Sequence, residues 1–130
     1  MTFTGTEGRE RRYFPRVSYR AYATLTTTLT KFDVHIVDVS FNGALAALIR
    51  PHNLTAGEEI VLTIEVSEGN LIKMQGKLAH QRDHMLGIEC RALGIDNQSR
   101  LRDLLKKESE RQNERSVKTM MDDHDQHNQP

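Results

Sequence analysis

Arginine side chains near the N-terminus are the first residues of this chain that could do chemistry. The stretch ERRYFPRVSYR, residues 10–20, holds four arginines, one proline and three aromatic rings in eleven residues. A guanidinium presents a planar fork of donors that fits a phosphate or a guanine edge, and its flat face can stack on a base. Because Pro15 disfavours helical backbone at the residue before it, we expect Arg12 and Arg16 to lie on an extended arm. The segment favours binding of an anionic, planar ligand, and a solvated basic arm is the other interpretation.

A second candidate set lies in the stretch VDVSFNGA, residues 37–44. The Asp38 carboxylate offers acceptors only, which suits the N1–H and the exocyclic amine of a guanine. Ser40 could donate to a phosphate or to the turn itself, and Gly43 would admit a backbone or a ligand where a Cβ would clash. A tight turn held by a local side-chain bond explains the same residues without a ligand.

Both stretches need a scaffold, and the rest of the sequence predicts one. Apolar and polar residues alternate from Val17 to Thr26, as is typical of a half-buried strand rich in Thr and aromatic residues. Five further strands are expected at residues 33–39, 44–49, 58–66, 71–81 and 85–92. Short strands joined by tight turns, with no helix between them, predict an all-β antiparallel sheet closed into a small barrel.

The periodicity becomes helical after the last strand. Apolar residues then recur at helical spacing, at Leu101, Leu104 and Leu105. With Asp96 or Asn97 as the cap, this predicts a helix that covers one opening or one face of the barrel. A second, short helix is expected around residues 117–121, and disorder at 122–130. The predicted organisation is a flexible segment at 1–10, a barrel with its arm and helix at 11–108, and a polar, partly helical or disordered tail at 109–130.

Composition narrows the classes of function. Lys plus Arg and Asp plus Glu each number 18, so attraction for an anion must be local. The single cysteine, Cys90, allows no intrachain disulfide, and no apolar run approaches the roughly 18 residues that cross a bilayer. We therefore expect a soluble, cytoplasmic protein. The histidines show no metal-ligand spacing, and no phosphate loop or nucleophile motif appears, so neither a metal, a cofactor nor an enzymatic activity is predicted.

Taken together, the motifs Arg12-x-x-x-Arg16 and Asp38-x-Ser40-x-x-Gly43 resemble those of the PilZ domain family, the bacterial receptors for cyclic di-GMP. The resemblance covers residues 9–107 and includes both motifs intact. It implies a six-stranded antiparallel barrel with a C-terminal helix, and a receptor that binds cyclic di-GMP without chemistry. A partner protein would then receive the signal.

The resemblance also implies roles for the arm. Arg12 and Arg16 would grip phosphates and guanine bases, and Arg11 would supply a third guanidinium. In this family a basic residue at that position goes with binding of two stacked ligand molecules. The ligand's phosphates would neutralise the repulsion among the arginines and order the arm against the barrel, and a partner could detect the change.

On the barrel, the resemblance places Asp38 and Ser40 at a guanine edge and a phosphate, and Gly43 at a point of close approach. The family also uses a residue of the later strands to pack against a base, and His80 or Arg82 could serve.

Two alternatives to the receptor stay open. A small barrel could bind RNA or single-stranded DNA with its basic arm, or the fold could be a protein-interaction scaffold that needs no nucleotide. Glu59 and Glu65 at exposed positions, with a neutral net charge, disfavour the first, and the intact motifs disfavour the second. The choice among motility, exopolysaccharide production and biofilm control, the ligand stoichiometry and the oligomeric state are open as well.

Overall fold

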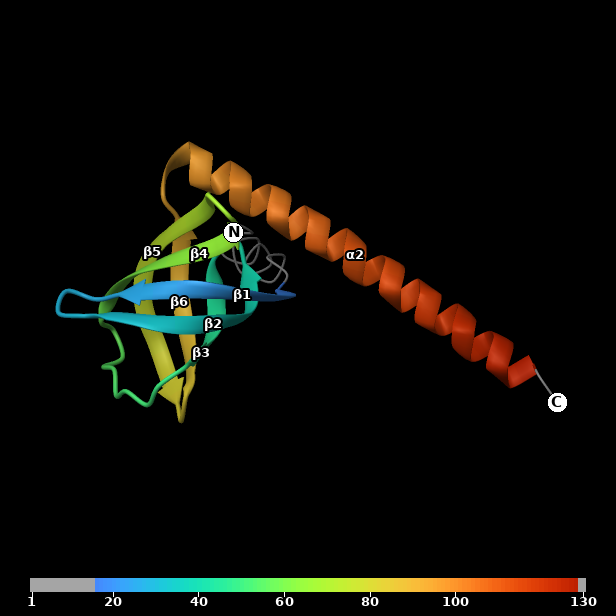
Figure 1. The fold of residues 1–130 in the computed structure, drawn as a ribbon, viewed down its shortest axis with the longest axis horizontal. Coiled ribbons are helices and arrows are strands. Elements are labelled where there is room, and N and C mark those ends of the chain that lie inside the picture. Colours follow the sequence, from blue (N-terminus) through green and yellow to red (C-terminus); the bar gives the residue numbers. More distant parts are fainter. Residues whose placement is uncertain (1–15, 129–130) are drawn as a thin grey trace, which may run out of the picture.

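Six strands and one long helix make up the part of the chain that the structure, a computed structural model, describes, residues 16–128 (Figure 1). Side chains are described for residues 16–113. The elements are β1 (Val17–Thr26), β2 (Lys31–Ser40), β3 (Gly43–Leu48), β4 (Glu59–Ser67), β5 (Asn70–Arg82), β6 (Met85–Ala92) and α2 (Gly94–Asn128).

The strands close into an antiparallel barrel in the order β1-β2-β3-β6-β5-β4. Strand β1 closes the ring, since it pairs with β2 along one edge and with β4 along the other. Closure pairs every strand with two neighbours, which avoids the long unpaired edges that promote aggregation. The predicted six-stranded antiparallel barrel with a C-terminal helix is confirmed.

Alternating apolar residues fill the barrel interior. The inward residues of β4, Ile60, Leu62 and Ile64, are each 2% exposed or less. Strands β5 and β6 contribute their own inward rows, Ile72, Met74 and Leu78 from β5 and Leu86, Ile88 and Cys90 from β6. These are the faces that the period-two pattern predicts, because burial of one face fixes which residues of a strand point inward.

The helix begins earlier than the sequence predicts. It starts at Gly94, and neither Asp96 nor Asn97 is its cap. The side-chain oxygen of Asn97 accepts a hydrogen bond from the backbone N–H of Lys73 at 2.9 Å. The side-chain NH₂ of Asn97 donates to the backbone carbonyl of Leu93 at 2.7 Å. Asn97 therefore joins the start of α2 to β5, and this use of its side chain could not be foreseen from capping preferences alone.

The helix also ends later than predicted. Residues 109–128 continue α2 without a break, where a separate short helix around residues 117–121 and a disordered end were expected. Polarity suggested disorder there, but Lys, Glu, Arg, Gln and Met, which are strong helix formers, recur as far as Met121, and no Gly or Pro interrupts the segment. A polar helix can therefore propagate from a nucleus that the barrel stabilises.

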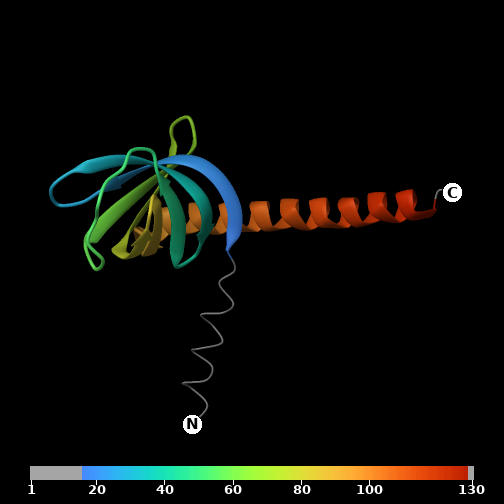
Figure 2. The same cartoon turned by 90° about the horizontal axis from the view of Figure 1, so that it is seen from below.

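Only the first part of α2 packs on the barrel. Leu101 and Leu104 are buried in the same cluster as the strand residues, and α2 lies against β1, β5 and β6. The remainder projects well past the barrel, as Figures 1 and 2 show. Across the described residues, no helix combines the length and apolar character that spanning a membrane requires.

Candidate functional site

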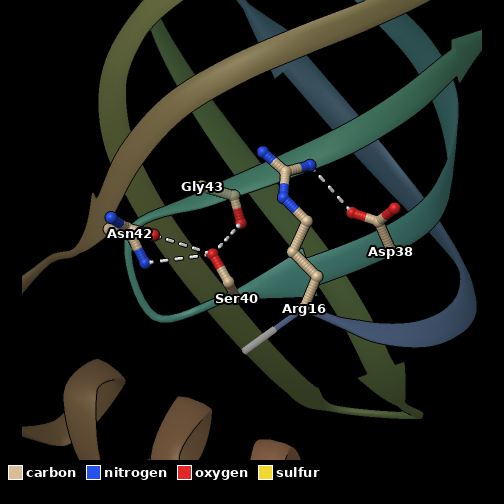
Figure 3. Close-up of polar contacts among 5 residues, drawn as sticks. All are labelled: Arg16, Asp38, Ser40, Asn42 and Gly43. Carbon is tan, nitrogen blue, oxygen red and sulfur yellow. Dashed lines mark hydrogen bonds and ion pairs between the residues drawn. The ribbon is translucent and has the colours of Figure 1, made fainter. Parts of the chain in front are cut away.

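An ion pair joins the two motifs. The Nη1 atom of Arg16 lies 3.1 Å from the Oδ1 atom of Asp38 (Figure 3). Arg16 stands directly before β1 and Asp38 near the end of β2, and their side chains are 56% and 22% exposed. An exposed pair of this kind contributes at most about 1 kcal/mol to stability. Breaking this ion pair, so that each group binds a ligand instead, would therefore cost little free energy.

A β-bulge turns Asp38 toward solvent. Phe32, Val34 and Ile36 point into the core, and strict alternation would send Asp38 inward after them. The pairing of β2 with β3 shifts between Ile36 and Asp38, which reverses the phase of the strand. Val39 is consequently fully buried, and Asp38 faces outward.

Ser40 is buried and bonded within its turn. Its hydroxyl lies 2.9 Å from the Asn42 side-chain oxygen and 3.3 Å from the Gly43 carbonyl, with the geometry to donate to either. It also accepts a bond from the Asn42 N–H at 3.3 Å, and only 1% of the residue is exposed. In this arrangement the hydroxyl stabilises the turn that follows Asp38 (Figure 3).

Gly43 lies where β3 and β6 come very close. A Cβ added to Gly43 would lie 2.7 Å from the carbonyl oxygen of Ile88, closer than such atoms approach in proteins. That carbonyl belongs to the backbone, so it cannot move aside as a flexible side chain would. The turn therefore needs glycine for contact with β6, whatever the ligand requires.

Asp38 shares a row across four strands with His80. Asp38 lies opposite Leu45, Leu45 opposite Gly87, and Gly87 opposite His80. A Cβ at Gly87 would collide with the His80 ring, so the imidazole lies against the bare Gly87 backbone. Asp38, whose carboxylate only accepts hydrogen bonds, lies at one end of this row, and the exposed ring of His80 lies at the other. The partly buried Leu45 lies between them.

A second bulge sets the direction of His80. The residues before it, Met74 and Leu78, face the core, and the pairing of β5 with β6 shifts between Leu78 and His80. Arg82 is also exposed but pairs with Met85, two rows away from the row of Asp38. Of the two candidates for a base contact, His80 is the one in register with Asp38.

Arg11 and Arg12 lie outside the described residues, so Arg16 is the one arginine of the candidate set that the structure describes.

Sequence analysis missed Asn42, whose backbone carbonyl also accepts a hydrogen bond from the Cys90 N–H at 3.3 Å. The preference of Asn for turns was the available signal. It also missed the Arg102 guanidinium, 5.8 Å from the centre of the Phe41 ring in the same turn. No sequence pattern links these two residues.

Other chemistry finds little support near this site. Burial raises the pKa of the Cys90 thiol to about 12, so the thiol stays protonated and unreactive at neutral pH. Among the described residues, no group of three or more His, Cys, Asp or Glu side chains could hold a metal ion. A hollow of about 800 Å³ lies on another part of the barrel wall, lined among others by Tyr22, Thr63 and Lys73. Of the described motif residues, Arg16 and Asp38 are the ones whose side chains are accessible to a ligand.

Comparison with known families agrees with this arrangement. The sequence model of the PilZ domain family matches residues 10–107, which include both motifs and all six strands. The match therefore spans well over half of the chain.

Solved structures share the fold at low sequence identity. The PilZ domain of YcgR from Escherichia coli with c-di-GMP is 12% identical, with a TM-score of 0.66, and the match covers 83% of this chain and 98% of that one. The PilZ domain of CeSA from a cellulose-synthesizing bacterium is 11% identical, with a TM-score of 0.57, covering 69% of this chain and 93% of that one. The Bacillus subtilis inhibitor of motility MotI/DgrA is 16% identical, with a TM-score of 0.63, covering 78% of this chain and 51% of that one.

Proposed function

This chain belongs to the PilZ domain family, and we propose that it is a bacterial receptor for cyclic di-GMP that carries out no chemistry on its ligand. The observation that carries the proposal is the contact between Arg16 and Asp38 at 3.1 Å. It brings a residue of the arginine motif and a residue of the turn motif to one place on the barrel surface. The YcgR domain with the same fold contains c-di-GMP in its solved structure, which supports the choice of ligand.

The proposed contacts follow from the chemistry of the groups. Arg12 and Arg16 grip phosphate oxygens or a guanine edge through paired N–H donors. Asp38 accepts from the N1–H and the amine of a guanine, after Arg16 has moved from its carboxylate to the ligand. His80 offers its exposed ring to a base from the far end of the same row. Ser40 and Gly43 hold the shape of the turn on which Asp38 depends.

Arg11 is the residue on which the number of ligands depends. A third guanidinium beside Arg12 would stabilise the additional phosphates of a second stacked molecule. Charge-assisted bonds contribute roughly 1.5–3 kcal/mol each, so several of them reach the roughly −8 kcal/mol of micromolar binding. The ligand ties the arm to the barrel in the bacterial cytoplasm, and a partner protein in motility, exopolysaccharide or biofilm control detects the closed form.

Isothermal titration with cyclic di-GMP tests the proposal through a double variant, Arg12→Ala/Arg16→Ala. We expect the wild-type chain to bind and the variant to lose affinity by at least about 100-fold, since two charged donors are removed. Arg50→Ala is the matched control, because Arg50 is an exposed arginine beyond the end of β3, away from the motif turn. Equal affinities of the wild type and the double variant would refute the assigned site, and no binding by the wild type would refute the function.

A further inference from the structure

Helix α2 contacts both segments that carry the proposed ligand groups. The Gln112 side-chain amide donates to the Ser18 carbonyl at 3.0 Å, two residues after Arg16. Ten residues earlier on the helix, the Arg102 guanidinium lies over the Phe41 ring, inside the turn between Ser40 and Gly43. One rigid element therefore contacts the root of the arm and the motif turn together, as the course of α2 beside the start of β1 in Figure 2 makes visible.

The start of β1 depends on the helix for a partner along one edge. Strand β4 pairs with β1 from Ala23 to Thr26, while the pairing with β2 begins already at Val17. Ser18 thus has Asp38 opposite it on one side and the Gln112 amide at its carbonyl. The Gln112 bond is exposed, and it gives this carbonyl a protein donor at a position where β1 is not paired with β4.

The neighbouring helical turn also lies near the start of β1. Glu108 is only 9% exposed, and its carboxylate lies 3.5 Å from the Arg111 guanidinium. Burial, and after it the negative charge of Glu108, raises the pKa of the Tyr19 phenol, while Arg111 acts in the opposite direction. The charged turn of α2 around Glu108 therefore lies near Tyr19, at the start of β1.

From these contacts we infer that Gln112 is a positioning residue for the start of β1 beside Arg16, and that docking of α2 residues 108–112 on the start of β1 is coupled to ligand binding. The inference rests on the proposed function and names how that site is regulated. A ligand held by Arg16 and Asp38 constrains the Ser18 backbone between them, and the same backbone anchors the helix. By reciprocity, whatever ligand binding adds to helix docking, helix docking adds to ligand affinity.

The test removes the Gln112 donor while keeping the side chain's size, with Gln112→Met. Titration with cyclic di-GMP should show an affinity about two- to tenfold weaker than wild type, the range expected for one lost hydrogen bond. Asn113→Ala is the control, since Asn113 is the exposed next residue on the helix. Hydrogen exchange at the amides of residues 108–112 should slow in the wild type when ligand is added.

Three outcomes separate the possibilities. Weaker binding by Gln112→Met alone, together with ligand-dependent protection of the helix, supports the coupling. A lower melting temperature with unchanged affinity and unchanged protection would mean that Gln112 is merely structural, which overturns the inference and leaves the receptor function intact. Failure of the wild-type chain to bind overturns the proposed function and the inference with it.

Discussion

Asp38 lies near the end of a strand in which strict alternation would point its side chain into the barrel. The sequence motif identifies the residue, but its direction depends on the bulge between Ile36 and Asp38, which arises from pairing with β3. The same holds for His80 and its bulge against β6. A bulge is a property of two strands together, so no single segment of sequence predicts it. The sequence could therefore nominate Asp38 and His80 as candidates, but it could not predict the directions of their side chains.

At this scale the sharpest prediction is for Asp38→Asn. An amide presents one donor and one acceptor, so it sets a donor against the guanine N1–H or its amine. Cyclic di-GMP affinity should fall about 10- to 100-fold, because bonds to charged groups contribute roughly 1.5–3 kcal/mol. Calorimetric titration measures the loss. Asp33→Asn, an exposed carboxylate of the same strand, should bind like wild type.

Stability should change little in Asp38→Asn, because the exposed pair with Arg16 contributes at most about 1 kcal/mol. An affinity equal to that of Asp33→Asn would show that the carboxylate does not contact the ligand. A collapse in melting temperature would instead place its role in folding.

Element by element, the strands were the most predictable part of the chain. Their period-two patterns are set by burial of one face, and the observed bounds differ from the expected ones by a few residues, as for β2, which begins at Lys31. The helix was harder. Its start depends on Asn97 bonding across to Lys73, and its later part is joined to β1 by the bond from Gln112 to Ser18, a separation of 94 residues. Contacts of that range leave no periodic signal.

Asn97→Ala tests the junction between the barrel and α2. The substitution leaves the Lys73 N–H and the Leu93 carbonyl without their side-chain partner. We expect the free energy of unfolding to fall by about 1–2 kcal/mol, even though Ala is the better helix former. Urea unfolding followed by circular dichroism measures this change.

Gln98→Ala provides the comparison, since Gln98 is the exposed neighbour in the same helical turn. It should be neutral or slightly stabilising. If the two variants unfold at the same urea concentration, the bonds of Asn97 do not hold the helix start.

Viewed as a whole, the molecule is a neutral barrel with a local cluster of arginines and a long polar helix. Zero net charge means that no general field attracts nucleic acid, so binding of an anion must come from specific contacts. In the proposed receptor those contacts come from Arg16 and Asp38, and the helix that leaves the barrel is bonded to the same region. The proposed ligand site and the projecting helix are thus adjacent in this fold.

The most direct measurement is a calorimetric titration of the wild-type chain with cyclic di-GMP, beside a single-stranded RNA oligonucleotide at low salt. We predict saturable heat with the cyclic dinucleotide, at one or two molecules per chain, and none with the oligonucleotide. Absence of heat and of any shift in melting temperature at saturating cyclic di-GMP would contradict the receptor function. Binding of the oligonucleotide alone would establish the RNA-binding alternative in its place.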